Sequence, residues 1–397
     1  MASAMNESLE SAIQHSFSPV ATERTLAEQR LKQLEFEEQF CGNLIAVISS
    51  QTESAHIRQM ATVLLKQYIQ KHWTHQNDKF ESPETPSQVK PQIRSSLLQC
   101  LQEPVSRIRV GVATAVGAIA RQDWPQEWPD LFDRLLEALS SKNSDLVHGA
   151  VHVLVEFSGE ITDLQIKVVI PPLFPVLLQI FADSQNYSIR TRTQIVSIFT
   201  TLTDMIGYMY SMDKSVIHLI TPTLPGFTEA FSVALSQPSA EPNADIGLKM
   251  EVIKAYACLA SKFPKLSMDT WLCHAYPLIC DVTSQACDMY CNAFVKNNVD
   301  PEEFVIDCEG EQYSLNSLIM AALDFIQTVA SNSKMAKKFI LPSLTRLLYY
   351  LILFMQMTEE KRAEWTSNPE QFVEDEDDEG TIDTVRTEAL DLILVRS

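Results

Sequence analysis

The chain has 397 residues, with 31 Lys plus Arg against 51 Asp plus Glu, so its formal net charge at pH 7 is −20. This acidic balance disfavours direct binding of nucleic acid or of an anionic membrane and favours basic protein partners. Only 10 glycines occur, and none forms a phosphate-binding loop motif. No unbroken apolar run exceeds nine residues, where about 20 are needed to cross a bilayer. The sequence therefore predicts neither a nucleotide-binding site nor a membrane span.

The polar, acidic N-terminal segment lacks the basic and apolar pattern of a secretory signal. The eight cysteines include no Cys-x-x-Cys pair of the kind found in zinc ribbons or thioredoxin-like proteins. We therefore expect reduced thiols in a protein of the cytosol or nucleus.

Along the chain, apolar residues recur at helical spacing almost everywhere, and no convincing run of alternation occurs, which predicts an all-α protein. The segment that starts at Pro129 aligns with the segment that starts at Pro171 at an offset of 42 residues. A third copy follows at an offset of 50 residues and contains Pro225, and weaker copies centre on Pro277 and Pro342. Because proline fits the first turn of a helix, each copy is expected to begin one helix of a repeated unit.

A second helix type alternates with these proline-led helices. Each begins with an aliphatic residue followed by a basic one, at Ile57-Arg58, Ile108-Arg109, Val147-His148, Ile189-Arg190 and Val385-Arg386. Two helix types that alternate at spacings of about 40 to 50 residues are typical of HEAT repeats. The sequence therefore predicts an all-α, right-handed α-solenoid of about eight antiparallel helix pairs.

The predicted pairs fall into three groups. Residues 1–124 hold repeats 1–3, residues 125–334 hold repeats 4–7, and residues 335–397 hold repeat 8. Two acidic insertions, 297–312 and 368–380, are expected to be loops, because unbroken like charge repels itself. The last residues are apolar, whereas a solenoid normally ends in a capping repeat, so we expect a C-terminally truncated array. The predicted pairs are 1–35, 36–74, 87–124, 128–161, 166–210, 214–265, 268–334 and 338–397.

Two side-chain clusters have the spacing of metal ligands. His148, His152 and Glu156 follow one another at intervals of four residues, but Gly149 stands where a zinc-protease helix needs glutamate. We therefore favour a polar helix face over a metal site. A stripe of cysteines is interpreted as small apolar side chains of a helix, because one helix cannot surround an ion with four ligands. Its members are Cys273, Cys280, Cys287 and Cys291.

The segment Trp124 to Pro129 (WPQEWP) holds two tryptophans, for which we favour a wedge between repeats over a peptide-binding platform. No nucleophile motif occurs, so no enzymatic activity is predicted. A run of six acids has three possible roles: a solvated loop, a binding site for basic cargo, or an autoinhibitory segment on the chain's own basic faces. The run comprises Glu374, Asp375, Glu376, Asp377, Asp378 and Glu379.

The stretch from Ile57 to Lys66, with Trp73, resembles the N-terminal signature of the importin-β (karyopherin-β) superfamily of nuclear transport receptors. The WPQEWP segment and residues 147–163 and 347–378 resemble members of that superfamily that carry core histones, ribosomal proteins and actin. The resemblance implies shuttling between cytoplasm and nucleus, contact with Phe-Gly nucleoporins at the pore, and control by RanGTP. It further implies that RanGTP binds the inner helices that begin near Arg58 and Arg109 and that the acidic run faces cargo. No cofactor is predicted.

Other functions stay open at this point. A histone chaperone or scaffold would share the fold and the acidic run but act without Ran. A short isoform that does not transport cargo is a second alternative, and a metal hydrolase built on His148, His152 and Glu156 is a third, disfavoured one.

Overall fold

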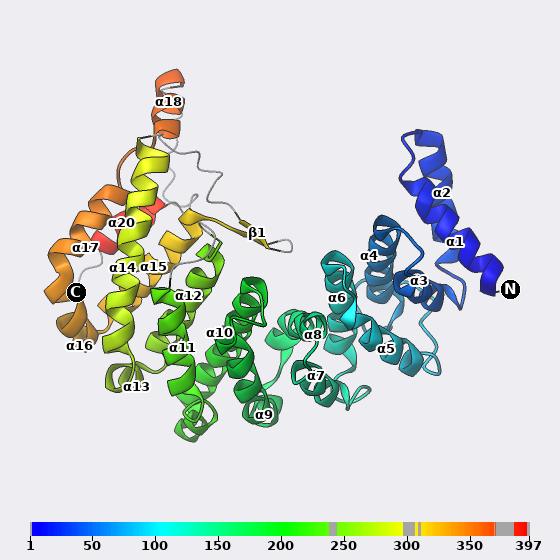
Figure 1. Ribbon diagram of the computed structural model, residues 1–397, viewed down its shortest axis with the longest axis horizontal. Coiled ribbons are helices and arrows are strands. Elements are labelled where there is room, and N and C mark those ends of the chain that lie inside the picture. The colour runs from blue at the N-terminus through cyan, green and yellow to red at the C-terminus, as the bar shows by residue number, and fades with distance from the viewer. Residues whose placement is uncertain are drawn as a thin grey trace. The chain divides into compact units, whose positions relative to one another are not determined.

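The computed structural model describes residues 2–237, 244–296, 306–308, 311–368, 370 and 385–394 (Figure 1). Its contacts divide the chain into two compact units, Met1–Thr162 (unit 1) and Asp163–Ser397 (unit 2). The acidic run Glu374 to Glu379 lies outside the described residues.

Unit 1 consists of antiparallel helix pairs that stack side by side. The described residues form four pairs, α1/α2, α3/α4, α5/α6 and α7/α8. The second helices α4, α6 and α8 pack against one another in sequence order and make one layer, which we call the second layer. The helices are α1 (Ala2–Ser16), α2 (Ala21–Leu34), α3 (Phe40–Ser49), α4 (Ala55–His72), α5 (Lys90–Gln99), η1 (Cys100–Gln102), α6 (Ser106–Asp123), α7 (Leu131–Leu139), α8 (Ser144–Phe157) and η2 (Ser158–Glu160).

Unit 2 repeats this arrangement with longer helices. Its described residues form the pairs α9/α10, α11/α12, α14/α15 and α17/α20, and α10, α12, α15 and α20 pack in order as the second layer. The helices are α9 (Asp163–Ala182), α10 (Ile189–Met212), η3 (Lys214–Leu219), α11 (Leu224–Ser236), α12 (Ile246–Lys262), α13 (Pro264–Asp269), α14 (Leu272–Tyr290), η4 (Cys291–Val295), α15 (Leu315–Ser331), α16 (Ser333–Met335), η6 (Ala336–Ile340), α17 (Leu341–Phe354), α18 (Glu359–Ser367) and α20 (Val385–Leu394). The predicted all-α array of helix pairs is confirmed.

Local sequence explains where several second-layer helices begin. Asn143 caps α8 by accepting hydrogen bonds from the backbone of the first turn, and Ser188 does the same for α10. Ser314 and Ser317 form a reciprocal capping box at the start of α15. These short polar side chains satisfy backbone N–H groups that have no partner within the helix.

The predicted position of proline is correct at two helices and wrong at two others. Pro225 and Pro342 lie in the first turns of α11 and α17. Inside a helix, proline removes a donor and crowds the carbonyl one turn earlier. The internal prolines all have exposed side chains, so water can solvate the carbonyls that lose their partners. They are Pro171, Pro172 and Pro175 in α9 and Pro277 in α14.

Helix α9 has 20 residues and a mean hydropathy of 1.7, enough by length and composition to span a membrane, and the bent pair Ser333–Phe354 and Glu359–Ser367 meets the same criterion. Neither segment contains an unbroken apolar run of the length of a span, because polar residues and prolines interrupt both. In the structure one face of α9 packs into the core of unit 2, which accounts for its apolar character. Its buried residues are Ile166, Val169, Ile170, Leu173, Phe174, Leu177, Ile180 and Phe181.

A chain of aromatic rings runs through the core of unit 2. Phe199 of α10 packs on Phe227 of α11 with ring centroids 4.4 Å apart, and Tyr256 of α12 packs on Trp271 at 4.7 Å. Phe231 joins the two groups, at 5.4 Å from Phe199 and 5.7 Å from Tyr256. These contacts tie successive helix pairs together, because large buried rings contribute much of the apolar area of a core.

One short β-hairpin was not predicted. Strands β1 (Ile306–Cys308) and β2 (Glu311–Tyr313) pair antiparallel within and just after the insertion 297–312 that was expected to be a loop. Two residues separate the strands in the sequence. The ring of Tyr313 lies where a side chain at Gly247 would be, so the hairpin packs closely on α12.

Candidate protein-interaction surfaces

A buried ionic network joins the N-terminal ends of α4, α6 and α8. Arg58 is 3% exposed, donates from Nε to the Ile48 carbonyl at 2.8 Å and pairs with the Glu103 carboxylate. Arg109 is 6% exposed, donates to the Glu103 carbonyl and pairs with Asp145 at 2.9 Å. Glu103 therefore links the two arginines through its side chain and its backbone.

The structure thus brings Arg58 and Arg109 together but buries both. A buried guanidinium needs compensating charge and hydrogen-bond acceptors, and here these come from within the chain. The geometry favours a positioning role, in which the two arginines hold the second-layer helices in register. Sequence reasoning missed Glu103, since nothing local distinguishes it from the other glutamates.

The polar face of α8 continues the network. His148 accepts a hydrogen bond at Nδ1 from Arg109 Nε at 3.0 Å, and its ring stacks on His152 with centroids 6.5 Å apart. Glu156 accepts from Thr114 at 3.1 Å and pairs with Arg121 at 2.7 Å. No group of three or more potential metal ligands occurs among the residues that the structure describes. Hydrogen bonds between α6 and α8 therefore explain why this face of α8 carries polar side chains.

The tryptophans of the WPQEWP segment are structural, as favoured from the sequence. Trp128 is buried, and the Arg94 guanidinium makes cation–π contacts with it and with Trp73, at 5.6 Å and 5.8 Å from the two ring centroids. Asp123 accepts from Trp73 Nε1 and from Arg94 Nε, both at 2.9 Å. Trp124 packs on Phe132 and Phe157. The segment therefore connects α5, α6, α7 and α8.

Glycines allow the second-layer helices to approach closely. A Cβ added at Gly111 of α6 would lie 2.2 Å from Thr62 Oγ1 of α4, and one at Gly117 would lie 2.5 Å from Glu156 Cβ of α8. At Gly149 the obstacle is the backbone carbonyl oxygen of Leu101, at 2.5 Å. Larger residues at these positions would force the helix pairs apart.

The cysteine stripe of α14 and η4 is mostly buried, as expected for small apolar side chains. Cys280, Cys287 and Cys291 are buried, and Cys273 is exposed. Burial raises the pKa of Cys287 to about 12. Thiolate character, which metal binding and nucleophilic reactivity require, is thus suppressed at Cys287.

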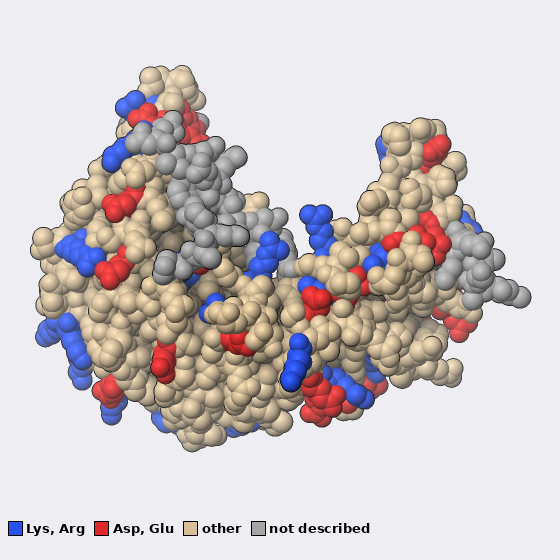
Figure 2. Space-filling view, in the orientation of Figure 1, with Lys and Arg blue, Asp and Glu red and all other residues tan. Residues whose placement is uncertain are grey.

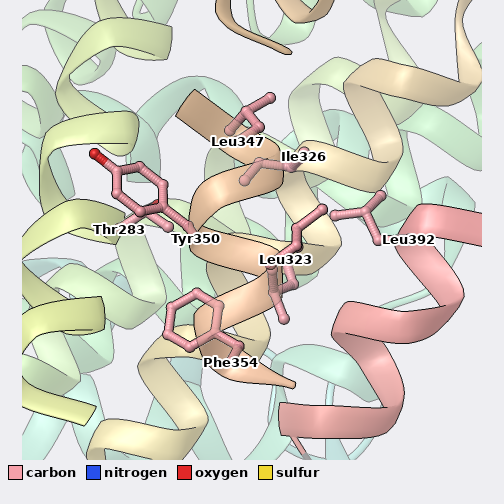
Figure 3. A pocket seen from close by; sticks show the side chains of 8 residues that line it. Thr283, Leu323, Ile326, Leu347, Tyr350, Phe354 and Leu392 are labelled. Atoms are coloured by element: carbon pink, nitrogen blue, oxygen red, sulfur yellow. The ribbon is translucent and has the colours of Figure 1, made fainter. Parts of the chain in front are cut away.

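A small cavity lies among α14, α15, α17 and α20 (Figure 3). Its volume is about 10 Å³, and its lining is apolar, including Leu323, Leu347, Phe354 and Leu392. A cavity of this size and lining holds neither a ligand nor an ordered water. It belongs to the core of the last helix pair.

An open groove of about 740 Å³ lies at the C-terminal ends of α10 and α12, beside α13; we call it the lysine groove. Its lining combines three lysines with three aromatic residues: Lys214, Lys262, Lys265, Tyr208, Tyr210 and Phe263. On the face shown in Figure 2, Lys and Arg side chains lie interspersed with Asp and Glu side chains. A lysine-rich concavity is therefore a local exception on an acidic protein.

Comparison with known proteins agrees with this architecture. The importin-β N-terminal domain family matches residues 27–103, and the family of IPO5-like TPR repeats matches residues 88–222. Importin-9 of Drosophila melanogaster is 32% identical over 372 residues, which cover 92% of this chain and 36% of the relative. Importin subunit beta-5 of Schizosaccharomyces pombe is 29% identical and covers 53% of this chain and 22% of the relative.

Solved structures show the same fold. The exportin Cse1 in its cargo-free, cytoplasmic state superposes with a TM-score of 0.69 at 17% identity and covers 98% of this chain and 42% of its own. Kap121p bound to Nup53p gives a TM-score of 0.60 at 19% identity and covers 98% of this chain and 33% of its own. The helix pairs are those of a karyopherin α-solenoid.

The chain spans about a third of the length of the importin-9 relative. Within that span the importin-β N-terminal domain match includes the Ile57–Trp73 stretch on which the family was inferred, and the importin-9 likeness extends over nearly the whole chain. On this combination of fold, domain match and sequence identity, the chain belongs to the importin-β (karyopherin-β) family and is a homologue of importin-9.

Proposed function

We propose that this chain forms part of a nuclear import receptor that binds basic cargo, core histones among them, shields it and carries it through the nuclear pore under RanGTP control. The observation that carries the proposal is a net charge of −20 on a karyopherin fold that is 32% identical to an importin-9. Complementary charge attracts a Lys- and Arg-rich protein and makes its binding sensitive to salt.

The six-acid run Glu374–Glu379 is the proposed cargo-binding segment, because it is the densest negative charge in the sequence. Weak contacts along the second layer of unit 2 would add to it as a multivalent interaction. Ribosomal proteins and actin are further proposed cargoes, and Phe-Gly nucleoporins are the proposed partners during passage between cytoplasm and nucleus. No catalysis is proposed.

RanGTP is the proposed partner of the second-layer helices α4 and α6. The importin-β N-terminal domain match covers α4 and ends at Glu103, the residue that joins Arg58 to Arg109. We propose that the two arginines act indirectly, by fixing the positions of α4 and α6 to which Ran binds. A pull-down with GTP-loaded and GDP-loaded Ran separates this receptor from a scaffold or chaperone that acts without Ran, because only the receptor prefers the GTP form.

The deciding experiment is a titration of the 397-residue chain with the H2A–H2B dimer across a salt series, with and without RanGTP. Neutralising Asp377, Asp378 and Glu379 is expected to weaken binding and flatten its salt dependence. The matched control neutralises three exposed acids, Asp130 directly before α7 and Asp133 and Glu137 on it, with the same loss of charge. If the two triple variants weaken binding equally, the acidic run is not part of the cargo-binding site. If the unaltered chain does not bind the histone dimer, the cargo proposal is wrong for this span.

A further inference from the structure

The lysine groove carries a charge opposite to that of the chain as a whole. Its lining contains three lysines and one carboxylate, Asp269. A basic cargo is repelled by such a surface, so the groove is poorly suited to the partners proposed above. A different ligand chemistry is needed to explain it.

Two of the three lysines lack an ionic partner in the described part of the chain. Lys262 pairs with Asp204 at 2.8 Å. In contrast, no described carboxylate lies within 4.0 Å of the ammonium groups of Lys214 or Lys265, and both side chains are exposed. Because Asp269 is the one carboxylate among the lining residues, these two uncompensated lysines leave the groove with a net positive charge, which attracts anions.

Aromatic side chains hold this charge in place and add an apolar wall. Lys214 Nζ lies 3.9 Å from the centroid of Tyr210, which in turn packs on Phe263 at 5.3 Å. Such a cation–π contact reduces the freedom of the lysine before any ligand arrives. Tyr208 lines the same groove and is 72% exposed, so its ring is available to an apolar group of a ligand.

We propose that the lysine groove binds a short acidic segment of a partner protein. Asp or Glu side chains of the segment pair with Lys214 and Lys265, and an aliphatic or aromatic side chain packs on Tyr208. The groove volume of about 740 Å³ falls within the range typical of ligand sites, about 300–1,000 Å³. A nucleic acid fits less well, because its dense charge outside the groove meets a chain of net charge −20.

The test uses the full 397-residue chain and a fluorescein-labelled peptide of ten residues that alternates Glu and Leu, followed by fluorescence anisotropy. The double variant Lys214→Glu, Lys265→Glu should weaken binding about tenfold or more, because charge reversal turns attraction into repulsion. The matched control, Lys334→Glu with Lys337→Glu, reverses two exposed charges of unit 2 that do not line the groove, and it should change binding less than about twofold.

Tyr208→Ala separates the apolar contact from the ionic one. It should weaken peptide binding severalfold and leave the salt dependence of binding unchanged. The milder double variant Lys214→Gln, Lys265→Gln removes the two charges without reversing them. Circular dichroism of every variant shows whether it is folded. A peptide that binds both double charge-reversal variants alike overturns the proposal. So does equal affinity for a single-stranded oligonucleotide of the same charge, or binding that appears only after Glu374–Glu379 are neutralised, since the groove would then be occupied by the chain's own acids.

Discussion

Replacing Glu103 by alanine tests the buried network that joins the second-layer helices of unit 1. The Glu103 carboxylate accepts hydrogen bonds from Arg58, from Gln51 Nε2 at 3.3 Å and from the Val105 backbone N–H at 3.2 Å. Arg58 is 3% exposed, so loss of this carboxylate leaves a buried guanidinium without its counter-charge. Removing one partner of a buried ion pair costs about 3–5 kcal/mol, because the remaining charge is left uncompensated.

Hydrogen exchange measured by mass spectrometry suits this prediction better than a single melting temperature, because helix-pair arrays open in segments. Protection of the amides of α4 and α6 should fall by a factor of about 10² to 10³, which corresponds to the lower part of that energy range. Amides of α12 in unit 2 serve as the internal reference and should not change.

Two further variants test whether the buried Arg58–Glu103 pair holds these helices together. Asp130→Ala removes an exposed pair with Arg134, whose atoms lie 3.5 Å apart, and should cost less than about 1 kcal/mol. The double variant Arg58→Met, Glu103→Leu removes both charges and should recover most of the lost protection. If Glu103→Ala is as mild as Asp130→Ala, or if the double variant is no better than Glu103→Ala, the buried pair does not hold these helices together.

Gly149→Ala should destabilise unit 1 by about 1–3 kcal/mol, because the new Cβ would meet the Leu101 carbonyl oxygen at 2.5 Å. Urea unfolding measures this change. Gly159→Ala is the control and should change the stability little, because no atom lies within 4 Å of a Cβ at that position. In native protein near pH 8, iodoacetamide should label exposed Cys273 and leave buried Cys287 unmodified until unfolding, as peptide mass spectrometry would show; early labelling of Cys287 would contradict its burial. Because the pKa of Cys287 is about 12 when folded and about 8.5 when unfolded, the stability it contributes should fall as the pH rises from about 8.5 to about 12. Comparison with Cys287→Ala should show a difference in slope of up to about 1.4 kcal/mol per pH unit.

The helical periodicity and the repeats were readable because they are local properties of the chain. Apolar residues at a 3.6-residue period specify a helix and its buried face wherever the helix is placed. The aliphatic–basic pairs at Ile57-Arg58, Ile108-Arg109 and Ile189-Arg190 therefore marked the starts of α4, α6 and α10 to within three residues. The family resemblance was likewise carried by contiguous segments.

Tertiary packing decided what those residues contact. Arg58 meets Glu103 across 45 positions of sequence, and Tyr208 shares a groove with Lys262 across 54, so no local pattern could pair them. The prolines inside α9 could not be placed from local sequence either, because they are tolerated on a helix face that the packing of unit 2 leaves exposed. Periodicity thus determines helices and their buried faces, whereas partners, burial of charge and grooves depend on which helices become neighbours.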